Sequence, residues 1–271
     1  MHQYKIFTLF FQVILTVNTL YCGFERTSQP TQVFSRGMSG SAFFSEQQAW
    51  INPASIAHVP SFRTSMFYSP SPFQLSQLSN YGVITSSPFW IASAAVGFSS
   101  FGFSLYREST GSIVLGSAIN EHIAAGVGIH LCHLSIEKYG SSTKGVMDIG
   151  MIYSLNEQVN IGLVLNNLSG ASFGGDDDIP RVITSGISYS FSEQAAIHMD
   201  VVKDVRFAAA YRAGFDIRLH DYIVVNAGTR SDASQLCGGI GIVIPDWQID
   251  YGITTHTELG LTHSIGITFH P

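Results

Sequence analysis

The C-terminal stretch WQIDYGITTHTELGLTHSIGITFHP, residues 247–271, decides the fold. In residues 247–253 apolar side chains occupy every second position, and Gln, Asp and Gly lie between them. Residues 259–269 repeat this alternation, with His263 interrupting the apolar face. A period of two is typical of β-strands, because successive side chains of a strand point to opposite faces. We therefore predict that these two segments form a β-hairpin.

The non-apolar face of this hairpin carries small and mostly uncharged residues. In the second arm they are Gly260, Thr262, Ser264, Gly266 and Thr268. A soluble sheet with one wet face normally fills that face with charged side chains. An apolar face toward lipid and a small polar face toward an enclosed interior is the pattern of a transmembrane β-barrel.

The composition favours the same fold. The 271 residues are 45% hydrophobic and 12% charged, about half the charge of an average soluble domain. No apolar run beyond the N-terminal leader reaches the roughly 18 residues of a transmembrane helix. The sequence thus predicts an all-β, antiparallel barrel that satisfies its backbone polar groups within the bilayer. A soluble β-sandwich is the alternative fold, and the net charge of −6 argues against a nucleic-acid partner.

Three regions are predicted along the chain. Residues 1–22 form a signal peptide, with IFTLFFQVILTV as its apolar core, cleaved after Cys22 or Gly23. Acylation of Cys22 is the alternative. Residues 23–60 show no strand period but are rich in aromatic residues, so we expect a plug tucked into the barrel rather than an exposed linker. Residues 61–271 form the barrel.

Strand candidates follow one another from residue 61 onward. They are 62–69, 75–86, 89–98, 101–107, 111–119, 122–134, 145–155, 158–167, 181–191, 194–202, 206–219, 222–230, 235–244, 247–255 and 260–269. We predict that fourteen of these fifteen are barrel strands, because single-chain bacterial barrels have an even number. Short turns recur at every second junction and longer breaks lie between them, which is the outer-membrane layout.

A family resemblance agrees with this prediction. GMSGSAFFSEQQAWINPASIA, residues 37–57, resembles the N-terminal signature of FadL-like outer-membrane proteins, most closely the PorV/PorQ branch. The stretches MDIGMIYSL, IGLVLNNLSG, IPRVITSGISYSF and IDYGITTHTELGLTHSIGITF are similar to that branch as well. The resemblance implies fourteen strands, a bacterial outer-membrane location and a plug motif at Asn52, Pro53 and Ala54. The chain departs from the family at Ser55, where Gly is usual, and in ending on Pro271 rather than an aromatic residue.

The resemblance leaves three non-enzymatic functions open. A PorV-like protein would take part in protein secretion or surface attachment of the type IX kind, with secreted cargo or secretion-system subunits as partners. A FadL-like transporter would carry a hydrophobic ligand across the outer membrane, with the plug as its gate. A structural outer-membrane protein would have only lipid as its partner.

Charged residues on strands are the candidate lumen residues. They are Asp148, Asp200, Asp216, Asp250, Arg181, Arg212, Arg218 and Arg230. Inside a barrel such residues either hold the plug through ion pairs and hydrogen bonds or line a polar path for a ligand. The sequence leaves both roles open.

Signals for other chemistry are weak. The chain has no G-x-S-x-G elbow and no phosphate-binding loop, so we expect neither an enzyme nor a cofactor. His130 and Cys132 share a strand face from which His133 points away, which leaves too few convergent ligands for zinc. Asp176, Asp177 and Asp178 are expected to form a solvated loop, with Ca²⁺ binding as the alternative. Cys132 and Cys237 are expected to be unpaired.

Overall fold

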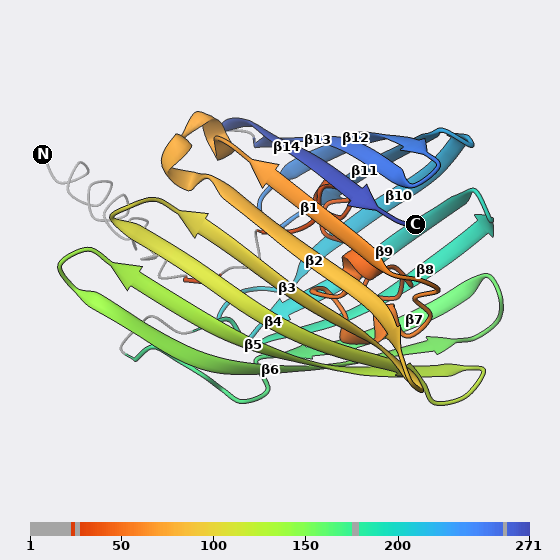
Figure 1. The fold of residues 1–271 in the computed structure, drawn as a ribbon, viewed down its shortest axis with the longest axis horizontal. Helices are drawn as coiled ribbons and strands as arrows, with labels where there is room; N and C mark the ends of the chain where they lie inside the picture. The colour runs from red at the N-terminus through yellow and green to blue at the C-terminus, as the bar shows by residue number, and fades with distance from the viewer. Residues whose placement is uncertain (1–22, 25–27, 175–178, 257–258) are drawn as a thin grey trace, which may run out of the picture.

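The computed structural model describes residues 23–24, 28–174, 179–256 and 259–271. Fourteen antiparallel strands form a closed barrel in which each strand pairs with its sequence neighbours and β14 pairs with β1 (Figure 1). The strands are β1 (Arg63–Ser69), β2 (Asn80–Phe89), β3 (Ala92–Gly102), β4 (Tyr106–Ala118), β5 (Ile123–Ile136), β6 (Gly140–Ser154), β7 (Val159–Asn166), β8 (Val182–Ser192), β9 (Ala195–Asp204), β10 (Ala210–His220), β11 (Ile223–Arg230), β12 (Gln235–Ile244), β13 (Trp247–His256) and β14 (Gly260–Phe269). The predicted antiparallel barrel of about fourteen strands is confirmed.

The helices of the described residues are short. They are α2 (Thr31–Ser35), η1 (Glu46–Gln48), η2 (Pro53–Ile56), η3 (Pro72–Gln74) and η4 (Ser76–Leu78). None of them is long and apolar enough to cross a bilayer. The predicted leader, residues 1–22, lies outside the described residues.

The apolar side chains face outward, as the alternation predicts. In the C-terminal hairpin Ile249, Tyr251 and Ile265 are 43–49% exposed, whereas Asp250 and Ser264 on the other face are at most 3% exposed. The outward faces of these two strands are therefore apolar and their inward faces are polar. This arrangement is the reverse of a soluble sandwich, whose apolar faces pack against each other.

The two ends of the barrel differ in their connections. At one end the strands are joined by turns of two to four residues, such as 90–91 and 245–246. At the other end the connections reach ten residues at 70–79 and fifteen residues at 167–181. We call these the short-turn end and the long-loop end. In outer-membrane barrels short turns face the periplasm and longer loops face the cell exterior.

Several predicted strand limits differ from the structure, and one predicted division into two strands is wrong. The segments 101–107 and 111–119 were expected to be separate strands, but β4 runs unbroken from Tyr106 to Ala118. The turn lies earlier, after Gly102, whose φ is +104°. The polar residues Ser109 and Thr110 resemble a turn in sequence, yet they pair with Ser100 and Ser99 of β3. Inside a barrel a polar residue does not interrupt a strand, because the interior face is itself polar.

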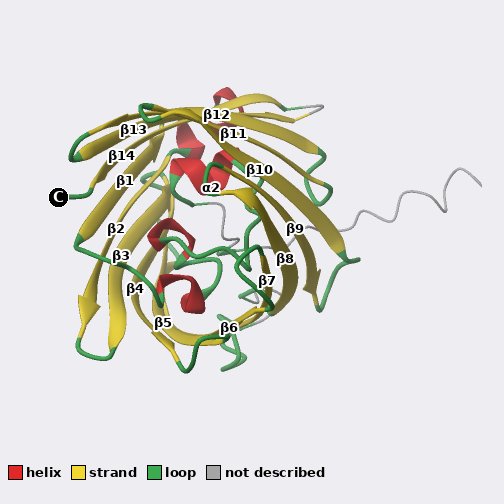
Figure 2. Cartoon of the chain, turned by 90° about the vertical axis from the view of Figure 1, so that its right-hand side faces the viewer, coloured by secondary structure: helices red, strands yellow, loops and turns green. Residues whose placement is uncertain are grey.

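Residues 28–60, here called the inner segment, lie within the ring of strands (Figure 2). The barrel wall meets this segment through inward glycines on eleven of the strands. A Cβ on any of them would come closer than 3.0 Å to an atom of the inner segment; they are Gly97, Gly116, Gly126, Gly150, Gly162, Gly186, Gly214, Gly228, Gly239, Gly252 and Gly266. We call this set the glycine cradle. It allows strand backbone and inner-segment atoms to approach more closely than any side chain permits.

Candidate functional site

The Asn-Pro-Ala motif fastens the inner segment to itself and to the wall. The Asn52 Oδ1 accepts the Ala54 N–H at 2.9 Å and so caps η2. The Asn52 Nδ2 donates to the carbonyl oxygens of Ser41 at 2.6 Å and Met151 at 3.3 Å. Asn52 and Ala54 are fully buried. The motif thus joins two turns of the inner segment to strand β6.

We expect the Asn52→Ala variant to lower the free energy of unfolding by about 1–3 kcal/mol, because it removes a helix cap and leaves buried groups without partners. Urea unfolding in lipid vesicles measures this loss. Gln158→Ala, in an exposed turn at the short-turn end, is the control and should change stability by less than about 0.5 kcal/mol. Equal stability of the two variants would show that the Asn52 hydrogen bonds do not stabilise the folded barrel.

Buried carboxylates of the strands bind the main chain and side chains of the inner segment. Asp200 of β9 accepts the N–H groups of Gly40 at 2.9 Å and Ser41 at 3.0 Å, and the Ser41 hydroxyl at 2.8 Å. Asp250 of β13 accepts the amide groups of Gln32 at 3.2 Å and Gln248 at 2.8 Å. These contacts support the first of the two roles expected for lumen charges, which is to hold the segment.

A third carboxylate, Asp216 of β10, forms the centre of a larger network. Its Oδ2 lies 2.6 Å from Arg36 Nη1 and 2.9 Å from His198 Nε2, and its Oδ1 accepts from Asn226. The Arg36 side chain is only 2% exposed, and its guanidinium lies 5.1 Å from the centre of the Phe43 ring. A buried cation of the inner segment is therefore paired with a partly buried anion of the wall.

Two Ser–His–Asp rows cross neighbouring strands, and sequence reasoning missed both. Ser188 and His198 are joined at 2.8 Å, and His198 in turn contacts Asp216. Ser112 and His130 are also joined at 2.8 Å. Each serine lies directly opposite its histidine in the strand register. The strand alternation places all these residues on the inward face, and this could be read from the sequence. Which serine lies opposite which histidine depends on the strand register, which the sequence does not give.

The Ser112 row ends on Asp148, another predicted lumen residue. His130 Nε2 lies 3.0 Å from Asp148 Oδ2. Asp148 also accepts the Asn167 N–H at 2.9 Å and the Asn166 amide at 3.1 Å. It therefore fixes the start of the β7–β8 connection.

The predicted arginines separate into three positions. Arg212 and Arg230 point into the lumen and share Asp232 at 2.8 Å and 2.9 Å. Burial alone would raise the pKa of Asp232, but hydrogen bonds from Arg230 and the charges of both arginines hold this pKa well below its usual range. Arg218 is exposed and lies at the short-turn mouth of the lumen.

The lumen assignment of Arg181 is wrong. Arg181 is exposed and directly precedes β8, in which Ile183 and Ile187, two and six residues further on, face outward. Val182 and Thr184 face the interior instead. The sequence pattern is ambiguous here because a loop of fifteen residues precedes the strand, so the alternation of the previous strand does not show which face Arg181 occupies.

The histidine, cysteine and aspartate residues considered as metal ligands do not form a metal site in the described part of the chain. Among the described residues no group of three or more His, Cys, Asp or Glu side chains converges on a metal position. His133 points outward to Thr143, as expected, whereas His130 and Cys132 are buried. Cys132 and Cys237 form no disulfide with each other. Residues 176–178, the three aspartates, lie outside the described residues.

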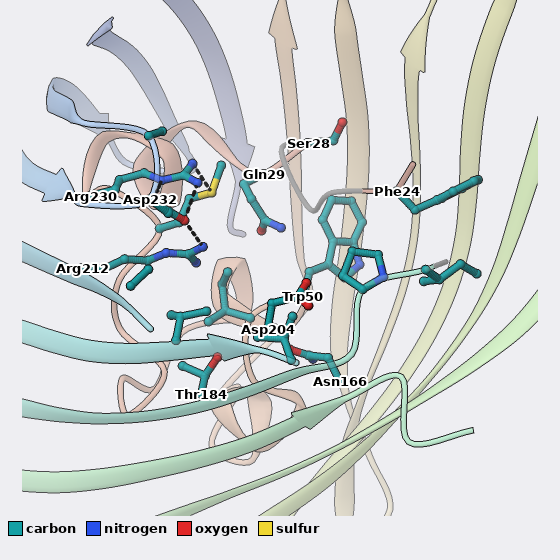
Figure 3. Close-up of a pocket in the computed structure, with 18 of the residues that line it drawn as sticks. Phe24, Ser28, Gln29, Trp50, Asn166, Thr184, Asp204, Arg212, Arg230 and Asp232 are labelled. Carbon is teal, nitrogen blue, oxygen red and sulfur yellow. Dashed lines mark hydrogen bonds and ion pairs between the residues drawn. The ribbon is translucent and has the colours of Figure 1, made fainter. Parts of the chain in front are cut away.

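A cavity of about 530 Å³ occupies the lumen on the long-loop side of the inner segment. We call it the long-loop chamber. Its apolar lining includes Phe24, Trp50, Phe101, Cys132, Val146, Ile179, Val202 and Ala210. Arg212, Arg230 and Asp232 group on one side of it, opposite Phe24 (Figure 3). The chamber thus has an extensive apolar lining, a charged corner at the two arginines and two further carboxylates, Glu108 and Asp204.

A second cavity, of about 880 Å³, opens toward the short-turn end. This short-turn chamber is lined by Arg36, Phe43 and Phe44 of the inner segment and by Glu157 and Arg218 at strand ends. The inner segment therefore forms the floor of one chamber and the roof of the other. A molecule that enters the long-loop chamber meets this segment before it reaches the opposite side.

No family model and no curated protein matches the chain. Solved structures do match its fold. The CymD monoaromatic hydrocarbon channel aligns with a TM-score of 0.67 and 14% identity over 92% of this chain and 99% of its own. The toluene transporter TbuX of Ralstonia pickettii aligns with a TM-score of 0.70 and 11% identity over 92% and 100%. A FadL homologue of Pseudomonas aeruginosa gives 0.65 and 10% over 89% and 98%.

These similarities establish a FadL-like barrel fold along nearly the whole chain. The sequence resemblance to FadL-like proteins is supported at that level. Its finer part, the PorV/PorQ branch, stays a prediction. Of the three structures named here, one is described as a monoaromatic hydrocarbon channel and one as a toluene transporter.

Proposed function

We propose that the protein resides in the bacterial outer membrane and carries small hydrophobic molecules across it. The long-loop chamber is the observation on which this proposal depends. Ligand pockets commonly have volumes of about 300–1,000 Å³ and are mostly apolar with a few polar groups. At about 530 Å³ the chamber suits a single-ring compound or a short hydrocarbon chain. The hydrocarbon channels that share the fold support this choice.

In this proposal residues 23–60 act as the plug that separates the two chambers. Two buried carboxylates, the partly buried Asp216 and the glycine cradle bind the plug to strands around the ring. An open aqueous channel is thereby closed. A hydrophobic molecule is desolvated in the long-loop chamber and moves on only when the plug or the wall beside it rearranges.

The Ala210→Trp variant tests the proposal. Ala210 is buried and faces the long-loop chamber, so an indole at this position fills space that the ligand needs. Uptake of labelled toluene is measured in whole cells that express the protein and lack other hydrocarbon channels. We expect uptake to fall by about tenfold or more, which corresponds to roughly 1.4 kcal/mol of lost binding.

Val201→Trp is the matched control. Val201 lies on the adjacent strand β9, in the residue pair next to that of Ala210, and faces outward with 44% exposure. Its uptake should equal that of the wild type. Wild-type cells that take up toluene no faster than cells without the protein would refute transport and favour a structural role.

Protein secretion of the PorV type is the second candidate, because the sequence resemblance favours it. In that role the barrel binds secreted cargo or a translocon subunit rather than a small molecule. Co-purification of such a partner, together with unchanged hydrocarbon uptake, would support secretion over transport. The matched structures favour the small-molecule function.

A further inference from the structure

Gly23 and Phe24, which directly follow the expected leader, lie inside the barrel toward its long-loop end. Phe24 is 8% exposed and belongs to a buried apolar cluster with Cys132, Val146 and Ile179. Its ring stacks on Phe173 of the β7–β8 connection, with 5.2 Å between ring centres. Phe24 also lines the long-loop chamber. These two residues are therefore part of the packed lumen and not of a tail.

Glu108 of β4 binds the main chain at this point. The Phe24 N–H donates to Glu108 Oε2 at 2.9 Å, and the Tyr106 hydroxyl donates to Glu108 Oε1 at 2.6 Å. A Cβ on Gly23 would lie 3.5 Å from the Tyr106 oxygen and 3.9 Å from Glu108 Oε1. The Phe24 nitrogen thus contacts a buried carboxylate, whose residue is 9% exposed, and Gly23 lies beside the same group.

We propose that the leader is removed after Cys22 or Gly23 and that Glu108 binds the α-ammonium group of the mature chain. Water adds across the peptide bond, the leader departs with a new carboxylate, and the mature chain keeps the amine, which takes a proton from water. A signal peptidase performs this step before the inner segment enters the barrel, where the bond would be enclosed. The buried carboxylate then gains a cation of opposite charge.

For a mature chain that begins at Gly23, the backbone at Phe24 supports a fixed terminus. Its φ of +57° lies in the left-handed region, which a bulky residue occupies only when its surroundings hold it there. Acylation of Cys22, the alternative in the sequence, would attach a diacylglycerol group one residue before Gly23, which itself lies in the lumen. Lipid anchors bind by burying their chains in the bilayer, so this position does not suit one.

The intact mass of the protein, expressed with its own leader and purified from the outer-membrane fraction, tests the processing step. We expect a chain that begins at Gly23 or Phe24 and carries no lipid. A mass that includes an acylated Cys22, or a chain that begins at Ser28 or later, would overturn the proposal. This result does not depend on transport, so it is separate from the test of function.

The reactivity of the α-amine tests the role of Glu108. A neighbouring carboxylate favours the protonated, unreactive form of an amine. We expect the Glu108→Gln variant to react with an amine-selective aldehyde at neutral pH about tenfold faster than the wild type. A tenfold change is what a decrease of about one unit in the pKa of the α-amine produces. Glu121→Gln, in the exposed β4–β5 turn, should react like the wild type. Tyr106→Phe, a milder variant, should show an intermediate rate; equal rates in all four proteins would refute the assignment.

Discussion

Replacing Gly126 by valine is expected to displace the inner segment and to destabilise the barrel by roughly 2–4 kcal/mol, at the upper end of overpacking effects. A Cβ on Gly126 would lie closer than 3.0 Å to main-chain atoms of Pro53 and Ala54. Main-chain atoms cannot rotate away as a flexible side chain does. The whole Asn52–Ala54 turn must therefore move. Urea unfolding in vesicles measures the loss of stability, and entry of a small hydrophilic solute measures the loss of closure.

Gly111→Val provides the matched control. Gly111 lies on the neighbouring strand β4, and a Cβ built on it has no atom within 4 Å. We expect its stability to change by less than about 0.5 kcal/mol and the barrel to stay closed. If the Gly126 and Gly111 variants behave alike, the glycine cradle does not hold the inner segment.

The Arg36→Met variant is expected to have the second large effect, a loss of about 3–5 kcal/mol. Removing one partner of a buried ion pair leaves the other charge uncompensated. Here Asp216 would keep only His198 and Asn226 as partners. The Arg36→Met/Asp216→Asn double variant, which has neither charge, should recover part of that loss. A double-mutant cycle in which the two effects simply add would show that the pair is not coupled.

The barrel could be predicted because its signal is local and repeated. The alternation in residues 247–253 and 259–269 needs only the period of a strand, and the scarcity of charge on the small-residue face shows that this face meets no bulk water. The inward positions of Asp148 and Asp250 follow from the same parity. The prediction for Arg181 is wrong because a long loop precedes it and interrupts the alternation. The prediction of a separate strand at 101–107 is wrong because a run of polar residues resembles a turn.

The contacts of the inner segment could not be predicted in the same way. Asp200 binds Gly40 across 160 residues of sequence, and Arg36 binds Asp216 across 180. The glycines at alternate strand positions can be recognised in the sequence. Their role depends on the inner-segment atoms that pack against them, and the sequence does not show these contacts. Asp232 was missed because it lies in the β11–β12 connection, where no period marks the direction of a side chain.

Photo-crosslinking with a diazirine derivative of toluene tests the central claim most directly. The protein is irradiated with the probe in outer-membrane fractions, and the modified residues are identified by mass spectrometry. We expect adducts on chamber residues such as Phe101, Val146 and Val202, which disappear when excess toluene competes. Adducts confined to outward residues such as Ile113 and Leu131, or adducts that toluene does not displace, would contradict a hydrophobic binding chamber inside this barrel.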